Sequence, residues 1–312
     1  MGNNKSVKKN MMSFQEFMVE FKLSFQDEYA DLCEIYEYHE EMIRKNGHDL
    51  HGIILRKKDN KIAPVFYYEE FYKSYRNGVS ISESIRKMAD FLYFQELPDE
   101  DMAKSLADWN CTKKKLIVKL INYENNRSFL RTVPFKRIGD MAVVSQVHLE
   151  SEVYGNGAIT VDEDLMDLWG ISREELFDTA LDNMLDYPVK MINLYEETSI
   201  DKEKYAEAPR IYVSIFEKPI NGAASILRTD ELKVFANKVG YDLFVMPVSI
   251  HEALLVEYRD DLREEFLAEM LYSINHDHES IDDVLSQNIY LLKRDHEYLI
   301  DITNNKDVCI VG

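Results

Sequence analysis

Residues 46–78, NGHDLHGIILRKKDNKIAPVFYYEEFYKSYRNG, contain in one stretch the turn, strand and helix signals that decide the fold. Asn46-Gly47 favours a positive φ and predicts a hairpin turn between a strand near 33–43 and a strand near 50–57. An antiparallel strand pair is therefore expected close to the start of the chain.

The second half of this stretch passes from strand to helix. Residues 61–67 form an expected third strand, and the aromatic run from Phe66 to Tyr75 predicts a helix that Asn77-Gly78 ends. Further strand pairs are expected over 140–149 with 157–161, 210–217 with 222–228, and 288–293 with 298–302. Helix signals follow the first two of these pairs. We therefore predict an α+β fold of mostly antiparallel sheets built from hairpin-then-helix units.

Helix starts are marked by capping boxes, in which a Ser side chain accepts from a backbone N–H and an acidic side chain reaches back. Four stretches fit this pattern: Ser13–Glu16, Ser80–Glu83, Ser172–Glu175 and Ser280–Asp283. A longer helix is expected near 260–275, with Leu262, Phe266, Met270 and Ile274 at steps of four and Leu267 and Leu271 beside them.

The boundary between the halves of the chain is expected in 95–135. A stretch with Leu116, Leu120 and Ile121 is interpreted there as helical. The expected parts are a smaller N-terminal α+β unit, a helical connector, a C-terminal α+β domain and a tail, over 1–97, 98–137, 138–303 and 304–312.

The phrase Asn-Gly-Ala occurs twice, at 156–158 and at 221–223. It could mark an internal duplication, or two turns that need the same positive φ. The sequence leaves both interpretations open.

The chain is acidic, with 37 basic and 57 acidic residues among 312 and a net charge of −20. Nucleic-acid binding needs Lys and Arg to neutralise phosphates, and the basic runs here, at 8–9, 56–58 and 113–115, are short. Nucleic acid is therefore an unlikely partner. An acidic surface suits a protein partner with a basic face, or a protein that imitates DNA, although these acids are mixed with Lys and Arg.

Three well-separated cysteines, Cys33, Cys111 and Cys309, predict neither a disulfide framework nor a zinc site. No apolar run reaches the roughly 18 residues of a membrane span, and the first residues lack the apolar core of a signal peptide. No dinucleotide or P-loop motif occurs. We expect a soluble cytoplasmic protein with no membrane contact and no cofactor.

Several short phrases occur in an order that resembles a domain-of-unknown-function family of clostridial (Firmicutes) gut bacteria. They include HGIILR at 51–56, LINYENN at 120–126, GDMAVV at 139–144, WGIS at 169–172, NGAASIL at 221–227 and PVSIHE at 247–252. The resemblance covers roughly residues 13–302. It implies a cytoplasmic bacterial protein, and it carries no activity, cofactor or catalytic residue to this chain.

The most suggestive candidate for catalysis is Ser249, His251 and Glu252, between two short apolar strands. Ser249 and His251 could share one face of an extended segment, so a nucleophile–base dyad is geometrically allowed. No nucleophile-elbow motif is present. The alternative is that Ser249 caps a turn while His251 and Glu252 bond to the backbone.

A metal site is conceivable at His276 and His278, because an H-x-H pair places both imidazoles on one side of an extended segment. His251 or His296 could supply a third ligand. The alternative is that these side chains interact with the negative end of the helix near 260–275.

The aromatic helix suggests a partner-binding surface. Tyr68, Tyr72 and Tyr75 combine an apolar ring with a polar end, which suits an interface. The alternative is that they belong to a tyrosine-rich core.

The biochemical function is not determined by the sequence, and no catalytic residue is assigned. The leading hypothesis is a non-enzymatic accessory or protein-interaction protein with an unidentified protein partner. Two alternatives remain: a hydrolase or metal-dependent enzyme centred on Ser249, His251 and Glu252, and an acidic DNA-mimic inhibitor.

Overall fold

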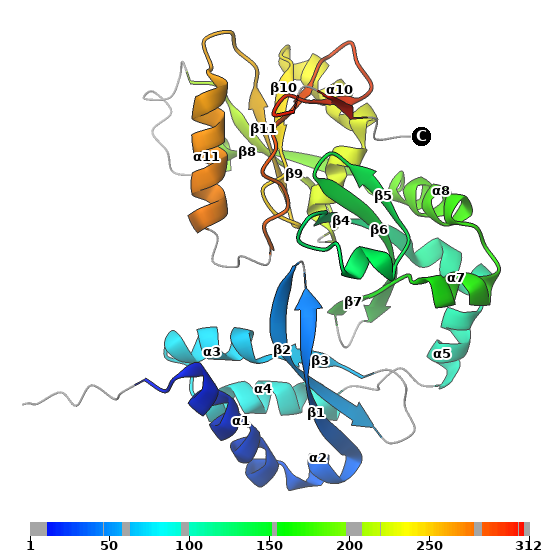
Figure 1. The fold of residues 1–312 in the computed structure, drawn as a ribbon, viewed down its shortest axis with the longest axis vertical. Helices are drawn as coiled ribbons and strands as arrows, with labels where there is room; N and C mark the ends of the chain where they lie inside the picture. Colours follow the sequence, from blue (N-terminus) through cyan, green and yellow to red (C-terminus); the bar gives the residue numbers. More distant parts are fainter. Residues whose placement is uncertain are drawn as a thin grey trace, which may run out of the picture. The chain divides into compact units, whose positions relative to one another are not determined.

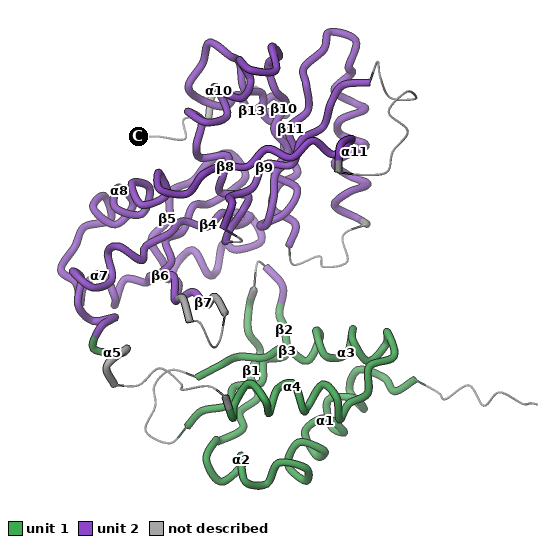
Figure 2. The backbone as a smooth tube through the Cα atoms, turned by 180° about the vertical axis from the view of Figure 1, so that it is seen from behind, with its two compact units in different colours: residues 1–45, 49–104, 150–155 green, residues 46–48, 105–149, 156–312 purple. Residues whose placement is uncertain are grey.

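The computed structural model describes residues 11–45, 47–57, 63–94, 100–151, 155–197, 208–218, 220–277, 283–304 and 306–308. The chain forms two compact units, which Figure 2 distinguishes by colour. Unit 1 comprises 1–45, 49–104 and 150–155, and unit 2 comprises 46–48, 105–149 and 156–312. Helices and antiparallel sheets occur together, so the predicted α+β class is confirmed.

Unit 1 packs helices against a three-stranded sheet of order β1-β2-β3 (Figure 1). Its elements are α1 (Phe14–Glu28), α2 (Ala30–Ile35), β1 (Tyr36–Lys45), β2 (His48–Lys57), β3 (Val65–Tyr67), α3 (Tyr68–Arg76) and α4 (Ile81–Phe94). Helix α5 (Glu100–Ala107) follows them. The core contains three phenylalanines of α1, Phe17, Phe21 and Phe25, packed with side chains of β2, α3 and α4.

Local signals account for much of this unit. Gly47 has φ 88° at the β1–β2 hairpin, which is the positive φ that Asn46-Gly47 predicted. Ser13 and Glu16 form the expected capping box of α1. Ser80 accepts from the Glu83 N–H at the start of α4.

Unit 2 contains two sheets. One has the order β4-β6-β5, with β7 also paired to β6, and is built from β4 (Leu116–Asn122), β5 (Phe135–Ile138), β6 (Met141–Ser151) and β7 (Gly155–Thr160). The other has seven strands in the order β14-β13-β12-β10-β11-β9-β8. These are β8 (Val189–Asn193), β9 (Ile211–Phe216), β10 (Leu243–Met246), β11 (Ala253–Glu257), β12 (Tyr290–Leu292), β13 (Leu299–Asp301) and β14 (Lys306–Val308).

Helices cover both faces of the seven-stranded sheet, with α10 on one side and α11 on the other (Figure 1). The helical elements of unit 2 are α6 (Trp109–Thr112), α7 (Glu163–Trp169), α8 (Arg173–Met184), α9 (Leu194–Glu197), α10 (Thr229–Val239) and α11 (Glu264–Asp277). Short 3-10 helices are η1 (Lys113–Lys115), η2 (Phe129–Arg131) and η3 (Gly222–Leu227). As expected, α8 begins with Ser172 accepting from the Glu175 N–H. Ser280 lies outside the described residues.

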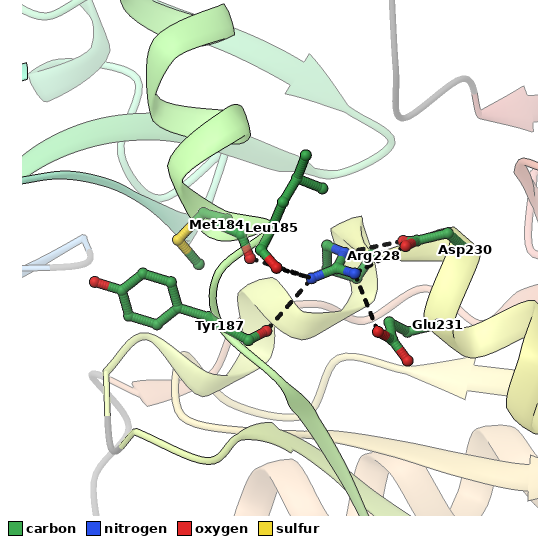
Figure 3. A network of polar contacts seen from close by, with 6 residues as sticks. All are labelled: Met184, Leu185, Tyr187, Arg228, Asp230 and Glu231. Carbon is green, nitrogen blue, oxygen red and sulfur yellow. Dashed lines mark hydrogen bonds and ion pairs between the residues drawn. The ribbon is translucent and has the colours of Figure 1, made fainter. Parts of the chain in front are cut away.

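A buried arginine joins two of these helices (Figure 3). Arg228 is 9% exposed and donates to the carbonyl oxygens of Met184 and Leu185, at the C-terminal end of α8. It also pairs with Asp230 and Glu231 in the first turn of α10. Its guanidinium therefore satisfies carbonyls that the end of a helix leaves unpaired.

Two local predictions are wrong. Residues 116–121, expected as helix, form β4, because an apolar run buried on both faces has no distinguishing period. Residues 222–227, expected as a strand, form the buried 3-10 helix η3. On α11, Leu267 and Leu271 are buried, and Met270 and Ile274, with Leu262 just before the helix, pack against the same core, as expected, whereas Phe266 is 53% exposed.

The two Asn-Gly-Ala phrases adopt different backbones. The first lies in strand β7, and the second leads into η3 with Asn221 at φ 43°. The local similarity on which an internal duplication would rest is therefore absent from the structure. The residues of the expected connector from 105 onward belong to unit 2.

No helix in the described part of the chain combines the length and apolarity that crossing a membrane requires.

Candidate functional site

Ser249 lies in the turn between β10 and β11. Its hydroxyl oxygen accepts hydrogen bonds from the backbone N–H groups of His251, at 3.1 Å, and Glu252, at 3.2 Å. The Ser249 N–H donates to the Glu252 carbonyl at 3.3 Å. With its side chain buried, Ser249 acts as the cap of this turn.

The ring of His251 is directed toward a different side chain. Its Nε2 lies 3.6 Å from Oδ1 of Asp283, and the side chain is 67% exposed. Among the described contacts, Ser249 is occupied by backbone donors and His251 by Asp283, so the structure does not bring them together as a nucleophile and its base. The hydrolase hypothesis stays a prediction to which this geometry adds no support.

The proposed metal ligands are likewise in other contacts. His276, in the last turn of α11, has Nδ1 2.9 Å from the Tyr272 carbonyl oxygen, and its ring lies 3.7 Å from the Tyr272 ring. His278 lies outside the described residues. His251 and His296 each lie beside a single aspartate. Over the described ranges, no three His, Cys, Asp or Glu side chains gather as a metal site.

The aromatic helix α3 faces the core of unit 1. Tyr68 is fully buried and donates to Glu40 at 2.7 Å. Burial, proximity to Tyr38 and the hydrogen bond to Glu40 raise the pKa of Tyr68 well above its usual range. Tyr72 donates to the Met12 carbonyl at 2.9 Å. Tyr68 therefore has no surface to offer a partner.

Tyr75 completes the contact with the segment before α1. Its hydroxyl accepts from the Met12 N–H at 3.4 Å, and its ring lies 5.3 Å from that of Phe17. Tyr72 and Tyr75 thus hold the start of α1 against α3. Partner binding through this helix stays a prediction, because its tyrosines pack and hydrogen-bond within unit 1.

A hollow that the sequence did not indicate lies on unit 2, next to the sheet that contains β4 and β5. Its volume is about 320 Å³. The residues that line it are Tyr123, Arg127, Leu130, Arg131 and Phe135. All but Phe135 belong to the connection from β4 to β5.

Side-chain amides hold this connection in place. The side-chain oxygen of Asn122 accepts from the Asn125 N–H at 2.9 Å, and the Asn126 amide donates to the Asn122 carbonyl at 2.7 Å. The Asn122 amide also donates to the Leu285 carbonyl at 3.0 Å. Both Asn122 and Asn126 are buried, so the loop is built on a fixed base.

The floor of the hollow is apolar. Leu130 is 5% exposed and belongs to a small core with Ile121, Val133, Ala142 and Val144. The half-buried rings of Tyr123 and Phe135 pack against this core, with their centroids 5.9 Å apart. The hollow therefore has aromatic and aliphatic walls.

The rim of the hollow is basic. The guanidinium of Arg137 lies 4.0 Å from the Tyr123 ring centre, and that of Arg127 lies 5.8 Å from it. Arg127 pairs with Glu124, and the distance from Nε of Arg127 to Oε2 of Glu124 is 2.8 Å. Arg131 is exposed and has no carboxylate partner in the described part of the chain. Lys136 lies over the Phe177 ring instead, 5.5 Å from its centre. Around the hollow, Arg127, Arg131 and Arg137 accompany one acidic side chain, Glu124, which leaves a net +2 in a chain of net −20.

The sequence did not indicate this basic surface, because its arginines are separated along the chain and form no basic run. Arg127 and Arg131 are four positions apart, and Arg137 reaches the same place from β5. The signal that could have indicated it is the interleaving of Arg with Tyr and Phe over 123–137. The arrangement can hold an anionic group at the rim and an apolar group on the floor.

Comparisons with known proteins give a family but no activity. A model described as a family of unknown function (DUF5688) matches residues 14–294. Searches of the curated proteins and of the solved structures found no match.

Proposed function

Because the chain belongs to the family of unknown function DUF5688, whose description names no activity, we propose a function from the site itself. The protein is a non-enzymatic interaction protein, and the hollow lined by Tyr123, Arg127 and Arg131 binds an acidic segment of a partner protein. The clostridial gut origin implied by the resemblance stays a prediction.

One observation carries this proposal. Arg131 lacks a carboxylate partner among the described residues and stands beside a hollow with aromatic walls, on a chain that is otherwise strongly acidic. Arg and aromatic side chains are enriched at protein interfaces, and Arg clusters recognise acidic motifs. A cluster of arginines on an otherwise acidic protein favours partners whose charge is negative where they meet it.

The test is a binding titration of the full chain with a fluorescent peptide rich in Glu and Asp, followed by anisotropy. Arg131→Glu is expected to abolish binding, and added salt to weaken it, because screening reduces attraction between exposed charges. Lys114→Glu is the matched control, since Lys114 is exposed, lies in η1 and does not line the hollow.

Equal binding by the wild type, Arg131→Glu and Lys114→Glu would place any interaction elsewhere. No binding of the acidic peptide by the wild type would remove the proposal.

A further inference from the structure

We propose that the hollow recognises a phosphotyrosine side chain of the partner protein. This inference rests on the proposed function and specifies what the partner presents. It follows from the size of the hollow, the number of its cations and the nature of its walls.

The volume argues for a group larger than a carboxylate. About 320 Å³ is near the lower end of the range of roughly 300–1,000 Å³ found for ligand pockets. A Glu or Asp side chain would leave the apolar floor uncovered. A phosphorylated aromatic side chain carries a ring that can lie against the half-buried rings of Tyr123 and Phe135.

The charges argue for a dianion. Arg127 and Arg131 both line the hollow and together carry two positive charges. A phosphate monoester carries a charge of about −1.5 to −2 at pH 7 and offers three acceptor oxygens. Each guanidinium can donate two parallel hydrogen bonds to such a group, and its three acceptor oxygens suit both arginines at once.

The present partner of Arg127 can give way to this ligand. The Arg127–Glu124 pair is exposed, with 64% and 54% of the two side chains accessible, and exposed pairs contribute little. Glu124 therefore competes with an incoming anion for Arg127. This predicts that Glu124→Gln raises the affinity for a phosphorylated ligand.

The experiment compares four fluorescent peptides on the full chain. They share one acidic flanking sequence and differ at the central residue, which is tyrosine, phosphotyrosine, phosphoserine or glutamate. The phosphotyrosine peptide is expected to bind at least about tenfold more tightly than the tyrosine and glutamate peptides, because charge-assisted hydrogen bonds are added. It should also bind more tightly than the phosphoserine peptide, which has no ring.

A pH series gives a second readout. The second pKa of a phosphate monoester is about 6, so lowering the pH from about 7.5 to about 5.5 converts most of the dianion to a monoanion. Binding of the phosphotyrosine peptide should weaken over this range. Binding of the glutamate peptide should not, because a free Glu titrates near about 4.3.

The outcomes separate the two proposals. Equal binding of the phosphotyrosine and glutamate peptides, lost in both cases with Arg131→Glu, would overturn the phosphotyrosine inference and leave the interaction proposal standing. Equal affinities for the phosphotyrosine and phosphoserine peptides would show that the ring of the ligand does not contribute to binding, and this would overturn the inference of phosphotyrosine. If no peptide binds, both proposals fall. Circular dichroism of Arg131→Glu and Lys114→Glu checks that both variants are folded.

Discussion

The guanidinium of Arg137, on β5, lies 4.0 Å from the centre of the Tyr123 ring, which follows β4. Arg137 Nε also donates to the Gly139 carbonyl at 3.0 Å, so the cation is held in place over the ring. This contact fixes one wall of the hollow and adds positive charge beside it. The Arg137–Tyr123 contact therefore affects both the shape of the hollow and the positive charge beside it.

Replacing Tyr123 by Leu should therefore weaken binding of the phosphotyrosine peptide. Tyr123→Leu removes the ring against which the ring of the ligand would lie, and an aromatic pair contributes about 0.5–1.5 kcal/mol, which corresponds to about two- to thirteenfold in affinity. Tyr123→Phe keeps the ring and should bind as the wild type does. The measurement is an anisotropy titration of the three proteins, and equal affinities for the Leu and Phe variants would contradict a role for the ring.

The N-termini of the helices could be predicted from the sequence. Ser13 and Ser172 accept hydrogen bonds from the predicted N–H groups, because a capping box is defined by residues three positions apart. The hairpin at Gly47 is equally local. These caps and this turn depend on one or two residue types at fixed spacing, so the sequence alone predicts them.

The candidate site could not be predicted in the same way. Tyr123 and Arg137 are fourteen positions apart and meet only because β4 and β5 both pair with β6. Predicting 116–121 as helix removed β4, and with it the sheet that brings these side chains together. Conversely, Ser249 and His251 are close in sequence, yet their partners come from the backbone and from Asp283.

Arg228 predicts a stability effect. Replacing it with Met removes the donor to the carbonyls of Met184, Leu185 and Tyr187, and we expect a loss of about 1–3 kcal/mol in the free energy of unfolding. The measurement is urea denaturation. Arg173→Met is the control, because its pair with Glu163 is exposed and should change stability by about 0.5 kcal/mol or less. Similar losses in both variants would show that the buried contacts of Arg228 contribute no more to the free energy of unfolding than the exposed pair of Arg173.

Asp230 predicts how this network depends on pH. The hydrogen bond from Arg228 holds the pKa of Asp230 below its usual value, and partial desolvation opposes this only in part. Because the pKa is lower in the folded state, the contribution of Asp230 to stability is present above the unfolded pKa of about 3.9. It is lost as the pH falls through the folded value.

Asp230→Asn should thus be less stable than the wild type near neutral pH, and the difference should shrink as the pH falls below about 4. Urea midpoints of both proteins at several pH values measure this. A difference that stays constant down to about pH 3 would show that the carboxylate charge does not contribute.

The glycines of the two Asn-Gly-Ala phrases provide a matched pair of substitutions. A Cβ at Gly222 would lie 2.0 Å from the carbonyl oxygen of His251, whereas a Cβ at Gly157 would meet nothing closer than Leu149, at 3.9 Å. The obstacle at Gly222 is backbone, so relief requires moving η3 away from the turn that holds Ser249.

We expect Gly222→Ala to cost about 3 kcal/mol or more in the free energy of unfolding. Gly157→Ala should stay within about 1 kcal/mol of the wild type. The measurement is urea denaturation of the two variants. Equal losses in the free energy of unfolding would mean that both glycines are under the same steric constraint, as a duplication requires. They would also show that the close approach of η3 to His251 does not limit the residue at 222.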